Sequence, residues 1–190
     1  MAIIQRYIKN NMKQEKIFSM EQMITHDQIQ SRIVEMAQMI EQVEDKRNAS
    51  SPPVFICVLN GAFMFFSDLV KQYHGLCEID FIRAKSYEGK DNSGGVKILK
   101  DIEVAIQGKN VYIIEDIIDT GETMKEVYLH LSSQLPNSIK IVTLLKRKGG
   151  DHPMDVYGFE INDEWVVGYG LDDNGLSRNL PAIYKLENGE

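Results

Sequence analysis

The feature that most constrains the fold is an apolar run that ends in acidic residues and leads into a glycine turn. Residues 111–114 are apolar or aromatic, and Glu115, Asp116 and Asp119 follow before Gly121. This order predicts a buried strand over residues 111–115, a turn at Gly121, and the start of a helix by Thr123. In open α/β sheets, such a turn lies beyond the carboxyl end of a strand, where ligands bind.

Apolar spacing elsewhere predicts strands that alternate with helices. Thr25 and Gln28 form a capping-box pattern that marks the start of a helix fading out after residue 44. Further helices are expected over residues 62–73 and 124–135, with Tyr128 and Leu135 on the buried face of the second. Residues 85–95 are expected to form a mobile loop or hairpin, and residues 146–153 a basic loop. The remaining apolar runs predict strands over residues 54–59, 79–84, 96–99, 139–145, 156–161, 165–169 and 182–186.

Alternating strands and helices predict a single α/β domain with a doubly wound, mainly parallel sheet and flanking helices. The chain has 190 residues and is 43% hydrophobic, which suits one domain with a substantial core. We expect residues 20–190 to form this domain. Residues 1–19 are expected to be an N-terminal extension, either a short amphipathic helix or a frayed segment.

Composition excludes several classes of partner. The net charge of -7 argues against binding to nucleic acid, which is held mainly by clustered Lys and Arg. No apolar run is long enough to cross a bilayer, and residues 1–11 lack the apolar core of a signal peptide. Cys57 and Cys77 have neither metal-site nor redox-motif spacing. These features predict a cytoplasmic protein with reduced thiols that binds neither nucleic acid nor membrane.

The residues around Gly121 are suited to a phosphorylated sugar. Amide groups at the start of a helix favour a phosphate, and Thr120 and Thr123 add hydroxyl donors. Glu115 and Asp116 are acceptors that fit a ribose diol or a metal-bound water. The chain contains neither a Walker A sequence nor a GxGxxG fingerprint with its later acid. The pattern therefore predicts a phosphorylated ribose as the ligand, rather than ATP or a dinucleotide.

The segment from Val111 to Met124 resembles the phosphoribosyl-pyrophosphate motif of type I phosphoribosyltransferases. Residues 58–63, 80–87, 158–161 and 166–172 match further segments in order, and they narrow the resemblance to the hypoxanthine-guanine branch. The similarity extends from about Thr25 to Leu186. It implies the type I phosphoribosyltransferase fold, in which the N- and C-terminal segments form a small hood.

This resemblance implies transfer of a phosphoribosyl group from phosphoribosyl pyrophosphate to hypoxanthine or guanine, with Mg²⁺ as the cofactor. The products are IMP or GMP and pyrophosphate. Asp119 is implied as the proton acceptor at N7 of the purine. The implied ribose and 5′-phosphate residues are Glu115, Asp116, Asp119, Thr120, Gly121, Glu122 and Thr123.

The same resemblance assigns the other ligand groups and an assembly. Family members form dimers and tetramers, so a homo-oligomer is implied. A lid is implied at Ser86 and Tyr87. The implied pyrophosphate site is Leu59, Asn60, Gly61 and Arg178, the purine site is Arg147, Trp165, Val166 and Asp172, and the metal site is Glu115, Asp116 and Asp172.

Two positions depart from the family pattern. Many relatives have a basic residue at the position of Asn60, so any side-chain charge at the pyrophosphate turn is missing. The family places a lysine where the alignment puts Arg147, and Lys146 or Lys148 takes that role if the loop shifts by one residue. The sequence also leaves open the preferred base, whether hypoxanthine, guanine or xanthine. A different class, a regulator that senses phosphoribosyl pyrophosphate, is the alternative function.

Overall fold

The computed structural model describes residues 19–44, 51–87, 95–149 and 154–187. Nearly all of the expected N-terminal extension, and the tips of the expected loops at residues 88–94 and 150–153, lie outside this part of the chain. In chain order the elements are β1 (Ser19–Ile24), α2 (His26–Glu44), β2 (Val54–Leu59), α3 (Phe63–Gln72), β3 (Glu78–Tyr87), β4 (Gly95–Lys100), β5 (Asn110–Ile118), α4 (Glu122–Ser132), β6 (Ser138–Arg147), β7 (Val156–Ile161), β8 (Val166–Val167) and β9 (Ile183–Glu187).

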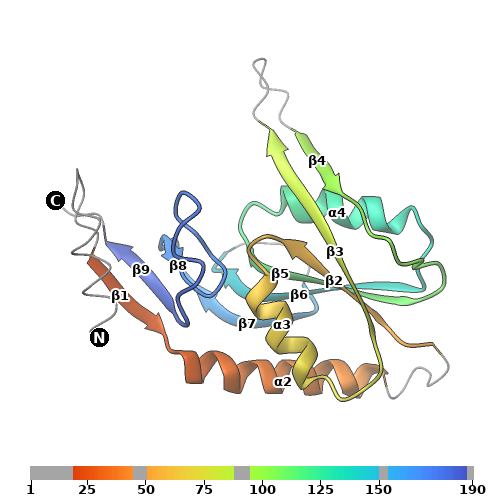
Figure 1. The fold of residues 1–190 in the computed structure, drawn as a ribbon, viewed down its shortest axis with the longest axis horizontal. Helices are drawn as coiled ribbons and strands as arrows, with labels where there is room; N and C mark the ends of the chain where they lie inside the picture. The colour runs from red at the N-terminus through yellow and green to blue at the C-terminus, as the bar shows by residue number, and fades with distance from the viewer. Residues whose placement is uncertain (1–18, 45–50, 88–94, 150–153, 188–190) are drawn as a thin grey trace.

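The main sheet has six strands in the order β4-β3-β2-β5-β6-β7 (Figure 1). β2 pairs in parallel with β3 and β5, and β6 pairs in parallel with β5 and β7. Only β4 runs antiparallel, along the outer edge of β3. Because the five parallel strands end at the same edge, the segments that follow β2, β5 and β6 are brought together there. The predicted mainly parallel sheet is confirmed.

Helices cover both faces of this sheet, as the doubly wound prediction requires. Alternate residues of β2 point to opposite sides, so Phe55 packs in one core with α2 and α3, and Ile56 packs in a second core with α4. The capping box at Thr25 is also confirmed. Thr25 N donates to Gln28 Oε1 at 2.8 Å, and Gln28 N donates to Thr25 Oγ1 at 3.2 Å.

A separate antiparallel sheet of three strands, in the order β1-β9-β8, forms the predicted hood (Figure 1). It joins the start of the described chain to its end, since β1 and β9 pair along their length. The strand expected over residues 165–169 is shorter than predicted. β8 contains only Val166 and Val167, because Gly168, Tyr169 and Gly170 all take positive φ values that a strand does not accommodate.

Several other boundaries were wrong. β5, β6 and β3 continue beyond their predicted ends, so Asp116 and Arg147 belong to strands. The extra length comes from pairing with neighbours, as in the contact of Ile118 with Lys146. The helix after the turn stops at Ser132, and Leu135 has a left-handed φ of 57° and is exposed. Tyr128 is also partly exposed rather than buried. Within the described residues, we find no helix with the length and apolar character needed to cross a membrane.

Candidate functional site

The carboxyl edge of the main sheet gathers the predicted site residues from four segments. These are the turn after β2, the end of β5 with the turn before α4, the end of β6, and the loop between β8 and β9. A cavity of about 160 Å³ opens at the end of β5. The residues that line this cavity are Glu115, Asp116, Ile117, Ile118, Asp119, Thr120, Gly121, Thr123 and Met124.

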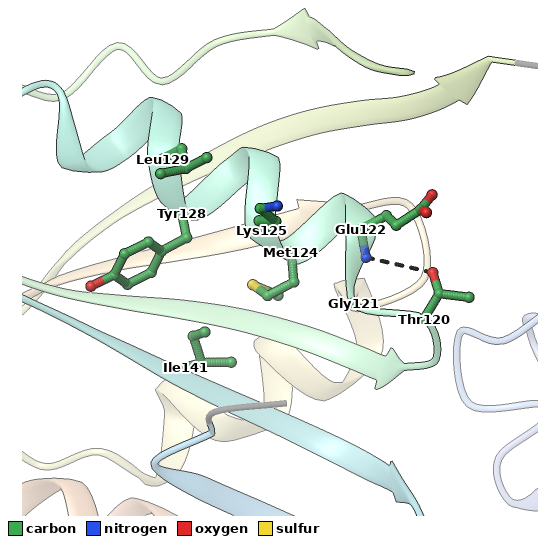
Figure 2. A pocket seen from close by; sticks show the side chains of 8 residues that line it. All are labelled: Thr120, Gly121, Glu122, Met124, Lys125, Tyr128, Leu129 and Ile141. Atoms are coloured by element: carbon green, nitrogen blue, oxygen red, sulfur yellow. Dashed lines mark hydrogen bonds between the residues drawn. The ribbon is translucent and has the colours of Figure 1, made fainter. Parts of the chain in front are cut away.

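The turn before α4 has the geometry of an anion-binding helix start. Gly121 is the N-cap, with φ 74° and ψ -3°, a left-handed conformation that side chains disfavour. Its carbonyl accepts a hydrogen bond from Lys125 N at 2.8 Å, so the helix begins at once. Thr120 Oγ1 faces Glu122 N at 3.5 Å (Figure 2). The first amides of α4 point beyond the helix and favour negative charge there.

Glu115 and Asp116 are both buried within β5, which continues past its predicted end at residue 115. Glu115 Oε1 accepts a hydrogen bond from Asp116 N at 2.9 Å, and Asp116 Oδ1 accepts one from Ile117 N at 2.8 Å. Burial raises the pKa of both carboxyl groups, and the nearby Asp116 raises the pKa of Glu115 further. Such a desolvated pair ionises most readily when a cation lies beside it.

The turn after β2 lies directly against this acidic pair. The peptide bond between Leu59 and Asn60 is cis, and Asn60 is exposed. Gly61 leaves no room for a side chain, because a Cβ there would overlap the carboxylate of Asp116. On its other side, the carbonyl of Gly61 lies where a Cβ of Gly170 would stand. Gly170 belongs to the loop between β8 and β9, residues 168–182, which we call the hood loop. The predicted pyrophosphate turn, the predicted ribose acids and the hood loop therefore meet at one point.

Arg178 connects the hood loop to the same point. Its Nη1 donates to the carbonyl of Gly170 at 2.6 Å, and its Nη2 forms an ion pair with Asp172 Oδ1 at 2.5 Å. Asp172 Oδ2 accepts a hydrogen bond from Gly175 N at 2.7 Å. The charge of Arg178 also opposes the rise in the pKa of Asp116, which indicates that the two groups are near each other. The predicted pyrophosphate and metal residues are thus neighbours.

Asp119 and Arg147 form the other side of the site. Arg147 Nε lies 2.8 Å from Asp119 Oδ1, and Arg147 Nη1 donates to the carbonyls of Asn162 and Glu164. Lys146 instead places its ammonium group 5.2 Å from the centre of the Tyr157 ring. Because neighbouring strand residues point to opposite faces, Arg147 and not Lys146 is the basic residue that faces Asp119.

Two of the expected purine residues, Trp165 and Val166, directly follow Glu164, whose carbonyl accepts a hydrogen bond from Arg147. Trp165 is 60% exposed directly before β8, and the following Val166 is buried. Val166 pairs with Lys185 of β9, which fixes its backbone. The expected lid residues, Ser86 and Tyr87, are the last two of β3 and pair with Val96 and Gly95 of β4. The loop that follows them lies outside the described residues, so the lid stays a prediction.

The sequence missed a polar cluster that holds the hood loop in place. Tyr169 Oη donates to Asp68 Oδ2 at 2.5 Å, and Gln30 Nε2 donates to the same oxygen at 2.8 Å. Burial raises the pKa of Asp68, but hydrogen bonds from Lys71, Tyr169 and Gln30 outweigh it, so the net pKa is lowered. The available signal was the pair of glycines that flank Tyr169, which indicates an unusual backbone.

A larger cavity of about 440 Å³ lies beside α4 (Figure 2). It shares Thr120, Gly121 and Glu122 with the turn, but the rest of its wall is mainly apolar, including Met124 and Ile141. It therefore lacks Glu115, Asp116 and Asp119, the acids expected beside the ribose and the metal. Among the described residues, no three His, Cys, Asp or Glu side chains cluster closely enough to bind a metal by themselves.

Comparisons with known proteins show which family this chain belongs to. Residues 25–174 match the family model described as "Phosphoribosyl transferase domain". The chain is 41% identical to the hypoxanthine-guanine-xanthine phosphoribosyltransferase of Tritrichomonas foetus, over 83% of this chain and 86% of that protein. It is also 41% identical to the hypoxanthine phosphoribosyltransferase of Escherichia coli strain K12, over 88% of this chain and 96% of that protein.

The fold has close counterparts among solved structures. The crystal structure of a hypoxanthine phosphoribosyltransferase from Staphylococcus aureus superposes with a TM-score of 0.81 and 37% identity, and each chain is covered to 95%. A helix start with a left-handed glycine N-cap, beside buried acids on a parallel sheet, thus coincides with extensive similarity in sequence and fold. The chain belongs to the phosphoribosyltransferase family, in its hypoxanthine-guanine branch.

Proposed function

We propose that this protein is a purine salvage enzyme that transfers the 5-phosphoribosyl group from phosphoribosyl pyrophosphate to hypoxanthine or guanine. The products are IMP or GMP and pyrophosphate. The observation that carries this proposal is the meeting of four groups at one sheet edge. They are the helix start at Gly121, the buried acids Glu115 and Asp116, the Arg178–Asp172 pair, and Asp119 with Arg147.

The sugar phosphate would bind along the β5–α4 segment, with its phosphate at the start of α4 and its ribose at the end of β5. The 5′-phosphate would bind the amides at Thr120, Gly121, Glu122 and Thr123, where the helix dipole favours an anion. The ribose hydroxyls would lie near Glu115 and Asp116. As the bond to pyrophosphate breaks, the anomeric carbon gains positive charge, and these carboxylates would stabilise it electrostatically.

The leaving pyrophosphate would bind between the turn after β2 and Arg178 of the hood loop. The turn of Leu59, Asn60 and Gly61 presents backbone there, and Arg178 supplies the positive charge that Asn60 lacks. Asp119 would accept the proton from N7 of the base while N9 attacks the sugar. Its carboxylate is 65% exposed, so a ligand has access to it, and the ion pair with Arg147 orients it.

The base would bind between Asp119 and the start of β8. Trp165 offers a free aromatic face for stacking, and Val166 offers backbone groups to the purine edge. Arg147 would donate to O6 of the base, and Asp172 would meet the purine edge through its backbone. A lid at Ser86 and Tyr87 would exclude water and so prevent hydrolysis of the activated sugar.

Magnesium is the cofactor that this proposal requires. Mg²⁺ is usually held by one or two carboxylates together with substrate phosphates, so a site without a cluster of three protein ligands fits it. Asp172 would ligate the ion, and Glu115 and Asp116 would contact its bound waters. The raised pKa values of Glu115 and Asp116 fit acids whose ionised forms a nearby cation would stabilise. When bound, the ion would neutralise charge on the departing pyrophosphate.

The alternative, a regulator that senses phosphoribosyl pyrophosphate, gains no support from the comparisons, since the relatives reported above carry enzyme names. We also propose a homodimer or homotetramer located in the cytoplasm. Phe63, Leu76 and Ile79 are exposed apolar residues on or next to α3 and β3, which supports an interface there. Free Cys57 and Cys77 fit a reducing compartment. Light scattering after size exclusion would test the assembly.

The direct test is an assay of pyrophosphate release. Purified protein, Mg²⁺ and phosphoribosyl pyrophosphate are mixed with hypoxanthine, guanine or xanthine in turn. Release that depends on both the base and Mg²⁺ is the expected result, and the ratio of the three kcat/KM values gives the preferred base. Tight binding of phosphoribosyl pyrophosphate without turnover on any base would instead support the regulatory alternative.

A further inference from the structure

The side chain of Arg147 joins two turns that are distant in the sequence. Its Nε lies 2.8 Å from Asp119 Oδ1 in the turn after β5. Its Nη1 donates to the carbonyl of Asn162 at 2.9 Å and to that of Glu164 at 3.2 Å, in the turn after β7. Arg147 is 19% exposed and Asp119 is 65% exposed, so the guanidinium is the more enclosed partner. One planar group therefore bridges the turn after β5 and the turn after β7.

This set of contacts needs an arginine. The guanidinium presents five donors in a fixed fork, so it reaches a carboxylate and two carbonyls at the same time. A lysine ammonium is a compact charge at the end of a flexible chain, and from this position it meets one of these acceptors well. Lysine is the residue that the resemblance implied at this position, so the arginine changes what the position does.

The two carbonyls belong to the turn that carries Trp165. Glu164 directly precedes it, and on the other side the Trp165 carbonyl accepts a hydrogen bond from Leu186 N at 2.9 Å. The ring itself is 60% exposed, so little packing holds it. Its position depends on the backbone, which β9 fixes on one side and Arg147 fixes on the other.

We propose that Arg147 is a positioning residue that holds Trp165 at a set distance from Asp119, and so pre-forms the gap that receives the base. This role adds to any direct contact with the purine. The kinetic part of its test rests on the proposed function, but the spectroscopic part does not. A pre-formed gap lowers the ordering cost of binding the base. The start of α4 at Gly121 is built by its own backbone, so loss of Arg147 should disturb the sugar-phosphate site less than the base gap.

The test compares Arg147→Lys and Arg147→Met with the wild type. Trp165 is the only tryptophan, so its fluorescence anisotropy reports on this turn alone. Without ligands, we expect the anisotropy to fall in both variants, because neither side chain holds both carbonyls. With substrates, we expect KM for the base to rise about tenfold in both variants, as for loss of a hydrogen bond to a charged group. KM for phosphoribosyl pyrophosphate should stay within about twofold.

The lysine variant separates the two roles. If Arg147 acts only as a donor to the base, lysine restores a normal KM and leaves the Trp165 anisotropy at its wild-type value, and that result overturns the proposal. Unchanged anisotropy in Arg147→Met overturns it as well. Circular dichroism checks folding, and if the methionine variant does not fold, the lysine variant alone decides.

A matched control comes from the same strand. Lys140→Met removes a basic side chain of β6 that pairs with Asp155 at 3.4 Å, at the opposite end of the strand. It should change neither the anisotropy nor either KM. If the wild type shows no transfer with any base, the proposed function fails, and the ligand-free anisotropy still decides whether Arg147 anchors Trp165.

Discussion

Gly61 and Asp116 come from different strand ends and lie so close together that a Cβ on Gly61 would overlap the Asp116 carboxylate. The proposed pyrophosphate turn and the proposed ribose acids are therefore in direct contact. This closeness exists because β2 and β5 are parallel neighbours that end at the same edge of the sheet. Any side chain at residue 61 must displace either the turn or the acid.

Gly61→Ala should therefore lower kcat/KM by about 100-fold, since a shift of about 1 Å in a catalytic constellation has an effect of this size. Overpacking should also cost about 1–3 kcal/mol of stability. Steady-state kinetics and thermal unfolding measure the two effects. Gly95→Ala is the control, because a Cβ there meets nothing within 4 Å. Wild-type kinetics in Gly61→Ala would contradict the close contact.

Gly121→Val should weaken binding of the 5′-phosphate. The residue has φ 74°, so a β-branched side chain strains the turn whose amides face the anion. We expect the Kd for IMP, measured by calorimetry, to rise by at least about tenfold, from the loss of 1.4 kcal/mol or more.

Gly108→Val is a matched control for this change. Gly108 has nearly the same φ, 72°, but lies in the turn that enters β5, at the other end of the strand. Both variants should lose stability from backbone strain, by about 1–3 kcal/mol. Only Gly121→Val should lose affinity for IMP, and an equal loss in both would refute the helix-start site.

Asp119→Asn should lower kcat by about 10²–10⁴-fold while the fold and the binding of phosphoribosyl pyrophosphate are kept. The amide retains the shape of the carboxylate but accepts no proton at neutral pH. Its ion pair with Arg147 is largely exposed on the Asp119 side, so the stability change should stay within about 1 kcal/mol. Glu126→Gln, an exposed acid of α4, is the control. Full turnover in Asp119→Asn would remove Asp119 from proton transfer.

Asp80 should make the folded state less stable as the pH falls into the acidic range. Burial raises its pKa, but amide hydrogen bonds from Val104, Phe81 and Glu103, and the charge of Lys100, outweigh this, so the pKa is lowered. A lowered pKa means that the folded state binds the proton less well than the unfolded chain. The stabilisation is therefore present above the unfolded value of about 3.9 and is lost as pH falls through the folded value.

Asp80→Asn tests this dependence, because its single amide oxygen cannot replace both carboxylate oxygens. It should cost about 1.5–3 kcal/mol at pH 7, with a smaller difference from wild type at pH 3. Urea unfolding at the two pH values measures it. A difference that is the same at both would show that the carboxylate charge contributes nothing.

Glu115 should change the stability with pH in the opposite direction to Asp80, and Glu115→Gln tests this. Burial and Asp116 raise the pKa of Glu115, so the folded state binds the proton more tightly, and the wild type loses stability as pH rises above about 4.3. Without Mg²⁺, the variant should melt higher than wild type at pH 8, with the gap shrinking towards pH 5. It should nevertheless bind phosphoribosyl pyrophosphate less tightly in the presence of Mg²⁺. A gap that does not change with pH would contradict the raised pKa.

Local sequence determined most of the helices and strands, and also the glycine turn at the centre of the candidate site. The capping box at Thr25, the apolar run of β2 and the acids before Gly121 each act within a few residues, through backbone preference, side-chain period and helix-end chemistry. These properties are readable without the rest of the chain. They predicted the parallel sheet, and they placed a phosphate site at the start of α4.

Only the tertiary structure decided which of these residues touch. The extension of β5 through Ile118, the contact of Gly61 with Asp116, and the three partners of Arg147 all depend on how separate elements pack. The same holds for Tyr169, whose partner Asp68 is on α3. The physical reason is that backbone preference is a property of neighbours along the chain, whereas burial and side-chain pairing are properties of neighbours in space.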